Sequence, residues 1–308
     1  MFATLMKTTI ITTQLALALL VAPAFAGNAK DYTYLALGDS IPFGMNPLLL
    51  PPYSNQPPTP DQFIGYPETV AAAEHLVQSK KEVNASCPGE SSGSFLNTAS
   101  PDNGCNSWHF QPLAAPIPPF KTTYSLHTNY TEAQMDFAES QLRTNKHINL
   151  VTLSIGANDV LLVLPQLEQC RTDPTCAHNV LDPVLQSYAV NLAAILSRIR
   201  AEYQGTLILV KYYSPTPAFD GVAVVLNDVM TQVATQLAMQ PNFAAVRFAD
   251  GFTAFQLASA LFNGDACPAG LLIRLPASPS TPPCDIHPSP LGRDLLAAAV
   301  ELAMGARH

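Results

Sequence analysis

The alternation of short apolar segments with helical patterns constrains the fold of this chain most strongly. Strand patterns lie at residues 32–38, 82–86, 149–155, 206–212 and 245–249, and helical patterns lie at residues 67–78, 131–142, 182–199, 222–239 and 291–304. Strands that alternate with helices predict a parallel sheet covered on both faces. We therefore expect an α/β fold: a three-layer α/β/α sandwich around a central, mostly parallel five-stranded sheet.

Two of the predicted helices begin at sequences typical of helix caps. Thr131 and Gln134 have the spacing of a capping box. Asp182 followed by Pro183 predicts an N-cap with proline at the first helical position. No linker separates two cores between the first and last predicted elements, so we expect one domain over residues 27–308.

The composition excludes two broad classes of protein. Charged residues make up 12% of the 308 residues and hydrophobic residues 48%, with a net charge of −8. The chain is too apolar to be intrinsically disordered and too acidic to bind a nucleic-acid backbone. Its 28 prolines concentrate in three long loops, at residues 46–60, 111–120 and 276–284.

Residues 1–26 have the pattern of a secretory signal peptide. Lys7 provides the positive charge, an apolar run follows, and Ala24-Phe25-Ala26 forms a small-x-small cleavage site. The alternative is a membrane anchor, but the apolar run is shorter than the ~20 residues that a spanning helix needs. We expect a secreted or periplasmic protein without a membrane span.

All six cysteines follow residue 26 and fall into three local pairs. An even number of cysteines in an exported chain favours disulfides. Metal binding is the weaker alternative because no CxxC spacing is present. Nearest-neighbour pairing predicts three bonds: Cys87–Cys105, Cys170–Cys176 and Cys267–Cys284.

Two polar blocks contain residues suited to nucleophilic catalysis. Ser40 follows the first predicted strand, where a hydroxyl can face a ligand at the carboxyl edge of a parallel sheet. His287 precedes the last helix and could accept the proton of a serine hydroxyl. Each residue alone is more simply explained as part of a turn or a cap.

Two further blocks contain donors suited to an oxyanion. Gly89 lies after the second predicted strand, and its backbone N–H can approach a ligand closely because glycine has no side chain. Asn158 follows the third predicted strand and offers a side-chain amide. The neighbouring Asp39 and Asp159 are expected to be structural, accepting backbone N–H groups in their turns.

Taken together, Ser40, Gly89, Asn158 and His287 occur in an order that resembles the SGNH hydrolases, also called GDSL esterases and lipases. The resemblance covers about residues 35–292, and the context of the second and third blocks is similar to the secreted bacterial branch. It implies a flavodoxin-like fold and ester hydrolysis through an acyl-enzyme on Ser40, with His287 as general base. The oxyanion would be held by the N–H groups of Ser40 and Gly89 and by the Asn158 amide. No metal or cofactor is required.

The last block departs from the Asp-x-x-His pattern that the family usually has. Cys284 stands three residues before His287, and Asp285 stands two before it. Either Asp285 reaches the imidazole through a different turn, or the backbone carbonyl of Cys284 accepts the imidazole N–H and leaves a Ser–His dyad. The carbonyl is slightly favoured, because a two-residue spacing in an extended segment does not point the two side chains at each other.

The substrate is less constrained than the reaction. Fatty-acyl esters or lysophospholipids are the first choice, because Leu48, Leu49 and Leu50 lie near the nucleophile and could line an acyl pocket. These leucines could equally pack on the core. Acetylated polysaccharides are the second choice. A non-catalytic glycan- or lipid-binding member is the alternative outside enzymes, but it should have lost one of Ser40, Asn158 and His287. We expect a monomer that acts on a small-molecule or lipid ester.

Overall fold

The computed structural model describes residues 33–76, 82–108, 118–170, 172–278 and 282–305. The predicted signal peptide, residues 1–26, lies outside the described residues, as does most of the Pro-rich loop at 111–120.

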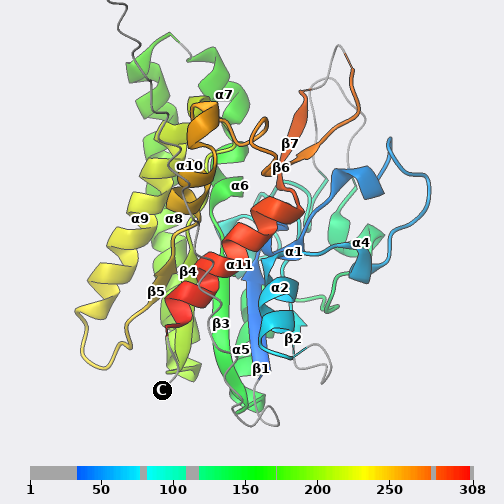
Figure 1. Cartoon of the computed structure of the whole chain (residues 1–308). Coiled ribbons are helices and arrows are strands. Elements are labelled where there is room, and N and C mark those ends of the chain that lie inside the picture. The colour runs from blue at the N-terminus through cyan, green and yellow to red at the C-terminus, as the bar shows by residue number, and fades with distance from the viewer. Residues whose placement is uncertain (1–32, 77–81, 109–117, 171, 279–281, 306–308) are drawn as a thin grey trace, which may run out of the picture.

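A parallel five-stranded sheet forms the centre of the molecule, as predicted (Figure 1). The strands are β1 (Thr33–Gly38), β2 (Glu82–Asn84), β3 (Ile148–Ser154), β4 (Thr206–Val210) and β5 (Arg247–Ala249). Their spatial order is β2-β1-β3-β4-β5, and all four pairings are parallel. The chain first moves from β1 to one side and then to the other, so a topological switch point lies between β1 and β3. Ligands of open parallel sheets bind outside such a point, at the carboxyl ends of the strands.

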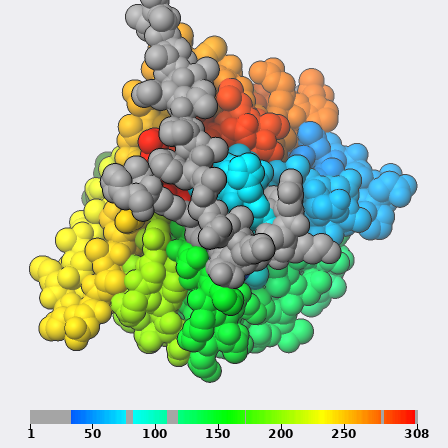
Figure 2. All heavy atoms as spheres, turned by 60° about the horizontal axis from the view of Figure 1, so that its bottom comes forward, coloured from blue at the N-terminus to red at the C-terminus, as the bar shows by residue number. Residues whose placement is uncertain are grey.

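Helices cover both faces of the sheet, which gives the predicted three layers (Figure 1). α2 (Tyr66–Ala73) and α11 (Pro290–Met304) pack together in one outer layer, and α10 (Gly251–Ala258) contacts α11. In the other layer, α8 (Pro174–Glu202) contacts both α5 (Gln134–Thr144) and α9 (Asp220–Ala238). Figure 2 shows the yellow end of α9 and the blue segment after β1 at opposite sides of the molecule.

Shorter elements gather beyond the carboxyl ends of the strands, toward the top of Figure 1. The short helices are α1 (Ser40–Phe43), α3 (Ser92–Leu96), α4 (Phe120–Thr123), α6 (Ala157–Leu161) and α7 (Leu164–Gln169), and the 3₁₀ turns are η2 (Pro47–Leu49), η3 (Pro60–Gln62), η5 (Pro217–Phe219) and η6 (Ala260–Phe262). A separate antiparallel pair, β6 (Leu272–Arg274) with β7 (Cys284–Pro288), precedes α11. This pair was not predicted from the sequence.

The core lies between the sheet and its helices. Every residue of β1 is buried, and Tyr34, Leu35 and Leu37 are fully inaccessible. Burial of a side chain such as leucine contributes about 1.5–3 kcal/mol relative to exposure. Leu49 and Leu50 pack partly buried against this core, in agreement with the second of the two interpretations given above for the leucine run.

Both predicted helix caps are wrong. α8 begins at Pro174, after an equivalent Asp-Pro pair in which Asp173 accepts the N–H groups of Thr175 and Cys176, and Pro183 lies inside the helix. α5 begins at Gln134 with Ala133 at the N-cap, which has no side-chain acceptor, and the Gln134 side chain is directed into the core.

All three predicted disulfides are present, namely Cys87–Cys105, Cys170–Cys176 and Cys267–Cys284. Among the described residues, α8 is long and apolar enough to meet a length-and-composition test for a membrane span. Core helices of globular proteins meet the same test, so this alone does not show a span.

Candidate active site

Ser40 is the first residue of α1, directly beyond the carboxyl end of β1. The turn that leads to it depends on Gly38, whose φ is +133°. A Cβ at this position would lie 2.0 Å from the carbonyl oxygen of Ser154, so there is no room for a side chain. The next residue, Asp39, caps α1 by accepting the N–H of Ile41 at 3.0 Å. The serine side chain is therefore held at the start of a helix, beside the switch point of the sheet.

Asp39 has an unusual environment for a carboxylate next to a nucleophile. It is 1% exposed, and its Oδ2 accepts a hydrogen bond from the Tyr212 hydroxyl. Burial raises the pKa of Asp39 to about 6, although the hydrogen bonds from Tyr212 and Ile41 and the charge of His287 oppose the rise. As expected, Asp39 accepts a backbone N–H in its own turn.

His287 lies on β7, and its Nδ1 contacts Oδ1 of Asp285. The same oxygen accepts the backbone N–H of His287 at 3.0 Å. Burial alone would raise the pKa of Asp285, but the hydrogen bond and charge of His287 outweigh it and hold that pKa below the usual range.

This geometry differs from the slightly favoured expectation that the Cys284 carbonyl would meet the imidazole. The Asp285 side chain folds back onto the N–H two residues on, as Asp does in Asx-turns. That local bend brings the carboxylate to Nδ1, a contact that a fully extended segment would not make.

Besides its pairing with β6, β7 is held against the rest of the molecule by contacts with several other segments. The Cys267–Cys284 disulfide ties its first residue to the loop before β6. The Tyr213 hydroxyl donates to the carbonyl of Ile286 at 2.5 Å. β7 also packs against α1, so the strand that carries His287 lies next to the helix that begins with Ser40.

Gly89 and Asn158 meet in a network of backbone contacts. The loop that contains Gly89 continues β2, because the N–H of Cys87 donates to the carbonyl of Gly38 at 3.0 Å. Asn158 follows β3 and donates its Nδ2 to the carbonyl of Glu90 at 3.0 Å. An amide nitrogen carries two hydrogens, so one bond to Glu90 leaves a second N–H.

Asn103 orients both groups. Its N–H donates to the carbonyl of Gly89 at 2.8 Å, and its Nδ2 donates to Oδ1 of Asn158 at 3.1 Å. The second bond fixes which end of the Asn158 amide is the donor end. Gly89 itself has a φ of +85°, and an added Cβ would lie 2.4 Å from the Asn103 carbonyl oxygen, so the position requires glycine.

Asp159 accepts a backbone N–H, as predicted, but the N–H belongs to Ser92 rather than to the turn that contains Asp159. Its Oδ2 accepts the N–H of Ser92 at 2.8 Å and its Oδ1 accepts the Ser92 hydroxyl at 2.5 Å. Burial raises its pKa. The contact ties the turn after β3 to the start of α3.

Three residues near the site were not identified from the sequence. In the sequence, Tyr212 ends a predicted strand, Gln134 fits a capping box, and Asn103 belongs to no motif. Each makes its important contact with a residue far along the chain, so no local pattern could have shown it.

One group of side chains in the described part of the chain combines metal-ligand atoms, namely Cys87, Glu90 and Cys105. The two sulfurs are joined in a disulfide. They are therefore not thiolates, the form in which cysteine binds metals.

Residues 36–295 match the model of the GDSL-like Lipase/Acylhydrolase family. The protein belongs to this family. Membership identifies it as a hydrolase that acts on esters. The match includes all four blocks, from the Ser40 turn to the His287 strand.

Solved structures share the fold of this GDSL-like hydrolase at low sequence identity. Phospholipase A1 from Streptomyces albidoflavus is 17% identical, with a TM-score of 0.51 over 89% of this chain and 99% of that one. The lipase Lip_vut3 from a goat rumen metagenome is 13% identical, with a TM-score of 0.50 over 90% of this chain and 99% of that one. No curated protein sequence matches the chain significantly.

Proposed function

We propose that this GDSL-like hydrolase is an exported serine esterase or lipase in which Ser40 is the nucleophile, His287 the general base and Asp285 the residue that orients the imidazole. The observation that carries the proposal is the contact of Asp285 with Nδ1 of His287, on a strand that packs against α1. A carboxylate on Nδ1 leaves Nε2 as the nitrogen that accepts a proton.

The reaction follows from these assignments. Nε2 of His287 takes the hydroxyl proton of Ser40 as the oxygen attacks the ester carbonyl, and the protonated imidazole then donates to the leaving alcohol. Water repeats the sequence on the acyl-enzyme, with His287 again as the base. The depressed pKa of Asp285 keeps its carboxylate charged, which favours the imidazolium formed in each step.

The oxyanion of each tetrahedral intermediate would be held by the backbone N–H groups of Ser40 and Gly89 and by the second amide hydrogen of Asn158. The contacts of Asn103 support this assignment, because one orients the Asn158 amide and the other holds Gly89 through its carbonyl before a substrate binds. Preorganised donors stabilise a developing charge without reorganisation during the reaction.

Fatty-acyl or lysophospholipid-type esters are the proposed substrates. Apolar side chains flank His287 in the sequence, with Ile286 42% exposed and Leu291 54% exposed. Residues 40–60, which follow the nucleophile, contain no charged side chain. An acyl chain gains from contact with such surroundings, whereas the polar surface of an acetylated sugar does not.

Export is proposed from the signal-peptide pattern of residues 1–26 and from the three disulfides. Disulfides persist in oxidising compartments and are rare in the cytosol.

The test compares Ser40→Ala with Ser197→Ala, a matched change at an exposed serine of α8, in the full chain expressed with its leader. Hydrolysis of p-nitrophenyl esters from acetate to palmitate is measured for both variants. We expect Ser40→Ala to lose all hydrolysis above background and Ser197→Ala to retain it, with kcat/KM rising from acetate toward longer chains. Retained activity in Ser40→Ala would remove the mechanism, and a preference for acetate would remove the substrate assignment.

A further inference from the structure

Gln134 is a fully buried polar side chain that binds the turn before the nucleophile. It is 0% exposed, and its Oε1 accepts the N–H of Gly38 at 2.6 Å while its Nε2 donates to the Gly38 carbonyl at 2.9 Å. Gly38 lies two residues before Ser40. One side chain from the first turn of α5 therefore satisfies both backbone groups at the end of β1.

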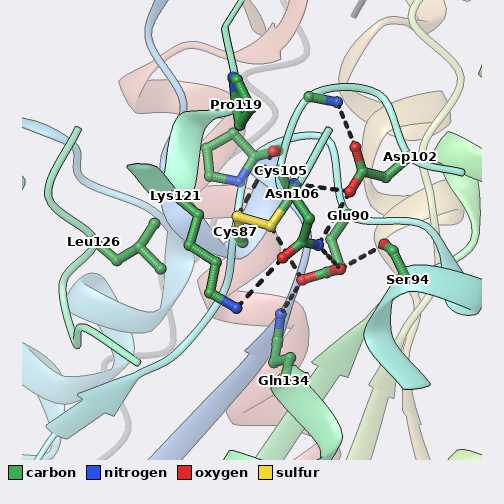
Figure 3. Close-up of a disulfide and its surroundings, with 12 residues drawn as sticks. Cys87, Glu90, Ser94, Asp102, Cys105, Asn106, Pro119, Lys121, Leu126 and Gln134 are labelled. Atoms are coloured by element: carbon green, nitrogen blue, oxygen red, sulfur yellow. Dashed lines mark hydrogen bonds between the residues drawn. A yellow bond between two sulfur atoms is a disulfide. The ribbon is translucent and has the colours of Figure 1, made fainter. Parts of the chain in front are cut away.

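The same nitrogen of Gln134 also reaches the loop that contains Gly89. Nε2 donates to Oε2 of Glu90 at 3.1 Å, and Glu90 is the residue directly after Gly89 (Figure 3). Gln134 thus bridges the Gly38 turn and the Gly89–Glu90 loop, which come from different strands.

Glu90 is itself held by several donors and is 0% exposed. Oε1 accepts the Ser94 hydroxyl at 2.5 Å and Nδ2 of Asn106 at 3.1 Å (Figure 3). Burial raises the pKa of Glu90 to about 7, against the opposing effects of the Ser94 hydrogen bond and the Lys121 charge. A carboxyl with this many partners is held in one position. A bond to it from Gln134 therefore fixes the distance between the Gly89–Glu90 loop and the Gly38 turn.

We infer that Gln134 is a positioning residue, which sets the placement of the Gly89 N–H relative to Ser40. The inference rests on the proposed function, because the Gly89 N–H matters to catalysis only if it binds an oxyanion. The backbone bond from Cys87 to Gly38 anchors the loop before Pro88, but the chain then turns at Gly89. Beyond that turn Asn103 and Asn158 bind the backbone carbonyls of Gly89 and Glu90, and Gln134 adds a bond to the Glu90 side chain that links this segment directly to the Gly38 turn.

The expected consequence is selective for the transition state. Loss of the bridge would displace an oxyanion donor without changing the surfaces that bind the ground-state ester. A misplacement of about 1 Å in a reacting group can cost about 10²-fold in rate. A loss of transition-state stabilisation alone lowers kcat with KM unchanged.

The experiment compares Gln134→Met, which keeps the length of the side chain but removes its hydrogen bonds, with Thr152→Val. Thr152 is a matched buried polar residue in β3 whose side chain bonds the Tyr34 hydroxyl at 2.7 Å and the Tyr66 hydroxyl at 3.4 Å, rather than the Gly38 turn or Glu90. We measure kcat and KM on p-nitrophenyl butyrate, the melting temperature, and amide hydrogen exchange over residues 85–96. Gln134→Met should lower kcat about 10²-fold at similar KM and speed exchange in that segment, whereas Thr152→Val should lower only the melting temperature.

A second pair of variants tests the other end of the bridge and covers the case in which Gln134→Met does not fold. Glu90→Gln keeps an oxygen that can accept from Gln134 and should stay within a few-fold of wild-type kcat, whereas Glu90→Met should show the kcat loss. Wild-type kcat in Gln134→Met, or equal kcat in the two Glu90 variants, would overturn the inference. If Ser40→Ala is inactive while these variants are fully active, only the positioning role fails. If Ser40→Ala is active, the proposed function itself fails.

Discussion

The Tyr212 hydroxyl donates a hydrogen bond to the buried Asp39 carboxyl, one residue before Ser40. Tyr212 is in turn fixed by Asn227 of α9, which accepts its N–H at 2.9 Å and donates to its carbonyl at 2.8 Å. The start of α1 is therefore tied through the end of β4 to a helix of the outer layer. Burial keeps the pKa of Asp39 at about 6 despite these donors.

The raised pKa of Asp39 predicts a specific dependence of stability on pH. The folded protein holds the proton of Asp39 more tightly than the unfolded chain does. The resulting contribution to the free energy of unfolding is fully present below the ordinary pKa of 3.8 and is lost as pH rises through about 6. A shift of this size corresponds to about 3 kcal/mol. Urea unfolding at pH 4, 5, 6 and 7 should show the wild type losing more free energy of unfolding over this range than Asp39→Asn.

Tyr212→Phe provides the complementary variant. The hydrogen bond from Tyr212 lowers the pKa of Asp39, so its removal should raise that pKa further and extend the loss of stability to higher pH. Parallel curves for the wild type and Asp39→Asn would show that the carboxyl does not titrate in this range.

Asp285→Asn tests whether the carboxylate on Nδ1 of His287 contributes to catalysis. Loss of the orienting carboxylate from a true Ser-His-Asp triad lowers kcat about 10⁴-fold, because the imidazole adopts the wrong tautomer. We expect a loss near this value in ester hydrolysis at pH 7–8. Asp294→Asn, which removes an exposed partner of Arg293, is the control and should leave kcat unchanged. A loss below about tenfold in Asp285→Asn would instead support a Ser40–His287 dyad.

Most of the sheet could be predicted from the sequence because its strands are short apolar runs. β1 and β3 are buried along nearly their whole length, and this burial is visible as continuous hydrophobicity. β6 and β7 form a separate antiparallel pair outside this sheet, and both contain charged or polar residues, Arg274 in β6 and Asp285 and His287 in β7. Their pairing depends on contacts between distant parts of the chain, including the Cys267–Cys284 disulfide.

Site residues that directly follow a predicted strand could be located from the sequence. Residues whose role depends on a contact with a distant part of the chain could not. Ser40 and Asn158 are placed by the strands they follow, which the pattern locates. Gln134 lies 96 residues from Gly38, so its capping-box spacing to Thr131 was the stronger local signal and the wrong one. The Asp285–His287 contact depends on a local bend that a general rule for extended segments does not describe.

The disulfide that ends at Cys284 should matter for both stability and activity. It closes a loop with a sequence separation of 17, and its replacement by Cys267→Ala/Cys284→Ala should cost about 3 kcal/mol by the loop-entropy model. kcat should also fall, because Cys284 begins the strand that carries His287. Chemical denaturation and ester hydrolysis check the two expectations.

Cys170→Ala/Cys176→Ala is the matched control for this variant. That bond has a sequence separation of only 6 and joins the end of α7 to the first turn of α8. We expect a smaller stability loss, about 2 kcal/mol, and unchanged kcat. An equal fall of kcat in both double variants would show that the effect is not local to His287.

Gly89→Ala tests the loop proposed to hold the oxyanion. The φ of +85° is unfavourable for alanine, and its Cβ would lie 2.4 Å from the Asn103 carbonyl oxygen, so the backbone must move. We expect a stability loss of roughly 1–3 kcal/mol and a fall in kcat of at least about 10²-fold, as for the loss of an oxyanion donor. Gly221→Ala in α9 is the control, because a Cβ there meets no atom within 4 Å and alanine favours the helix. It should retain wild-type kcat with equal or greater stability. Wild-type kcat in a folded Gly89→Ala protein would exclude Gly89 as a donor, because the N–H could not keep its place once the loop had shifted.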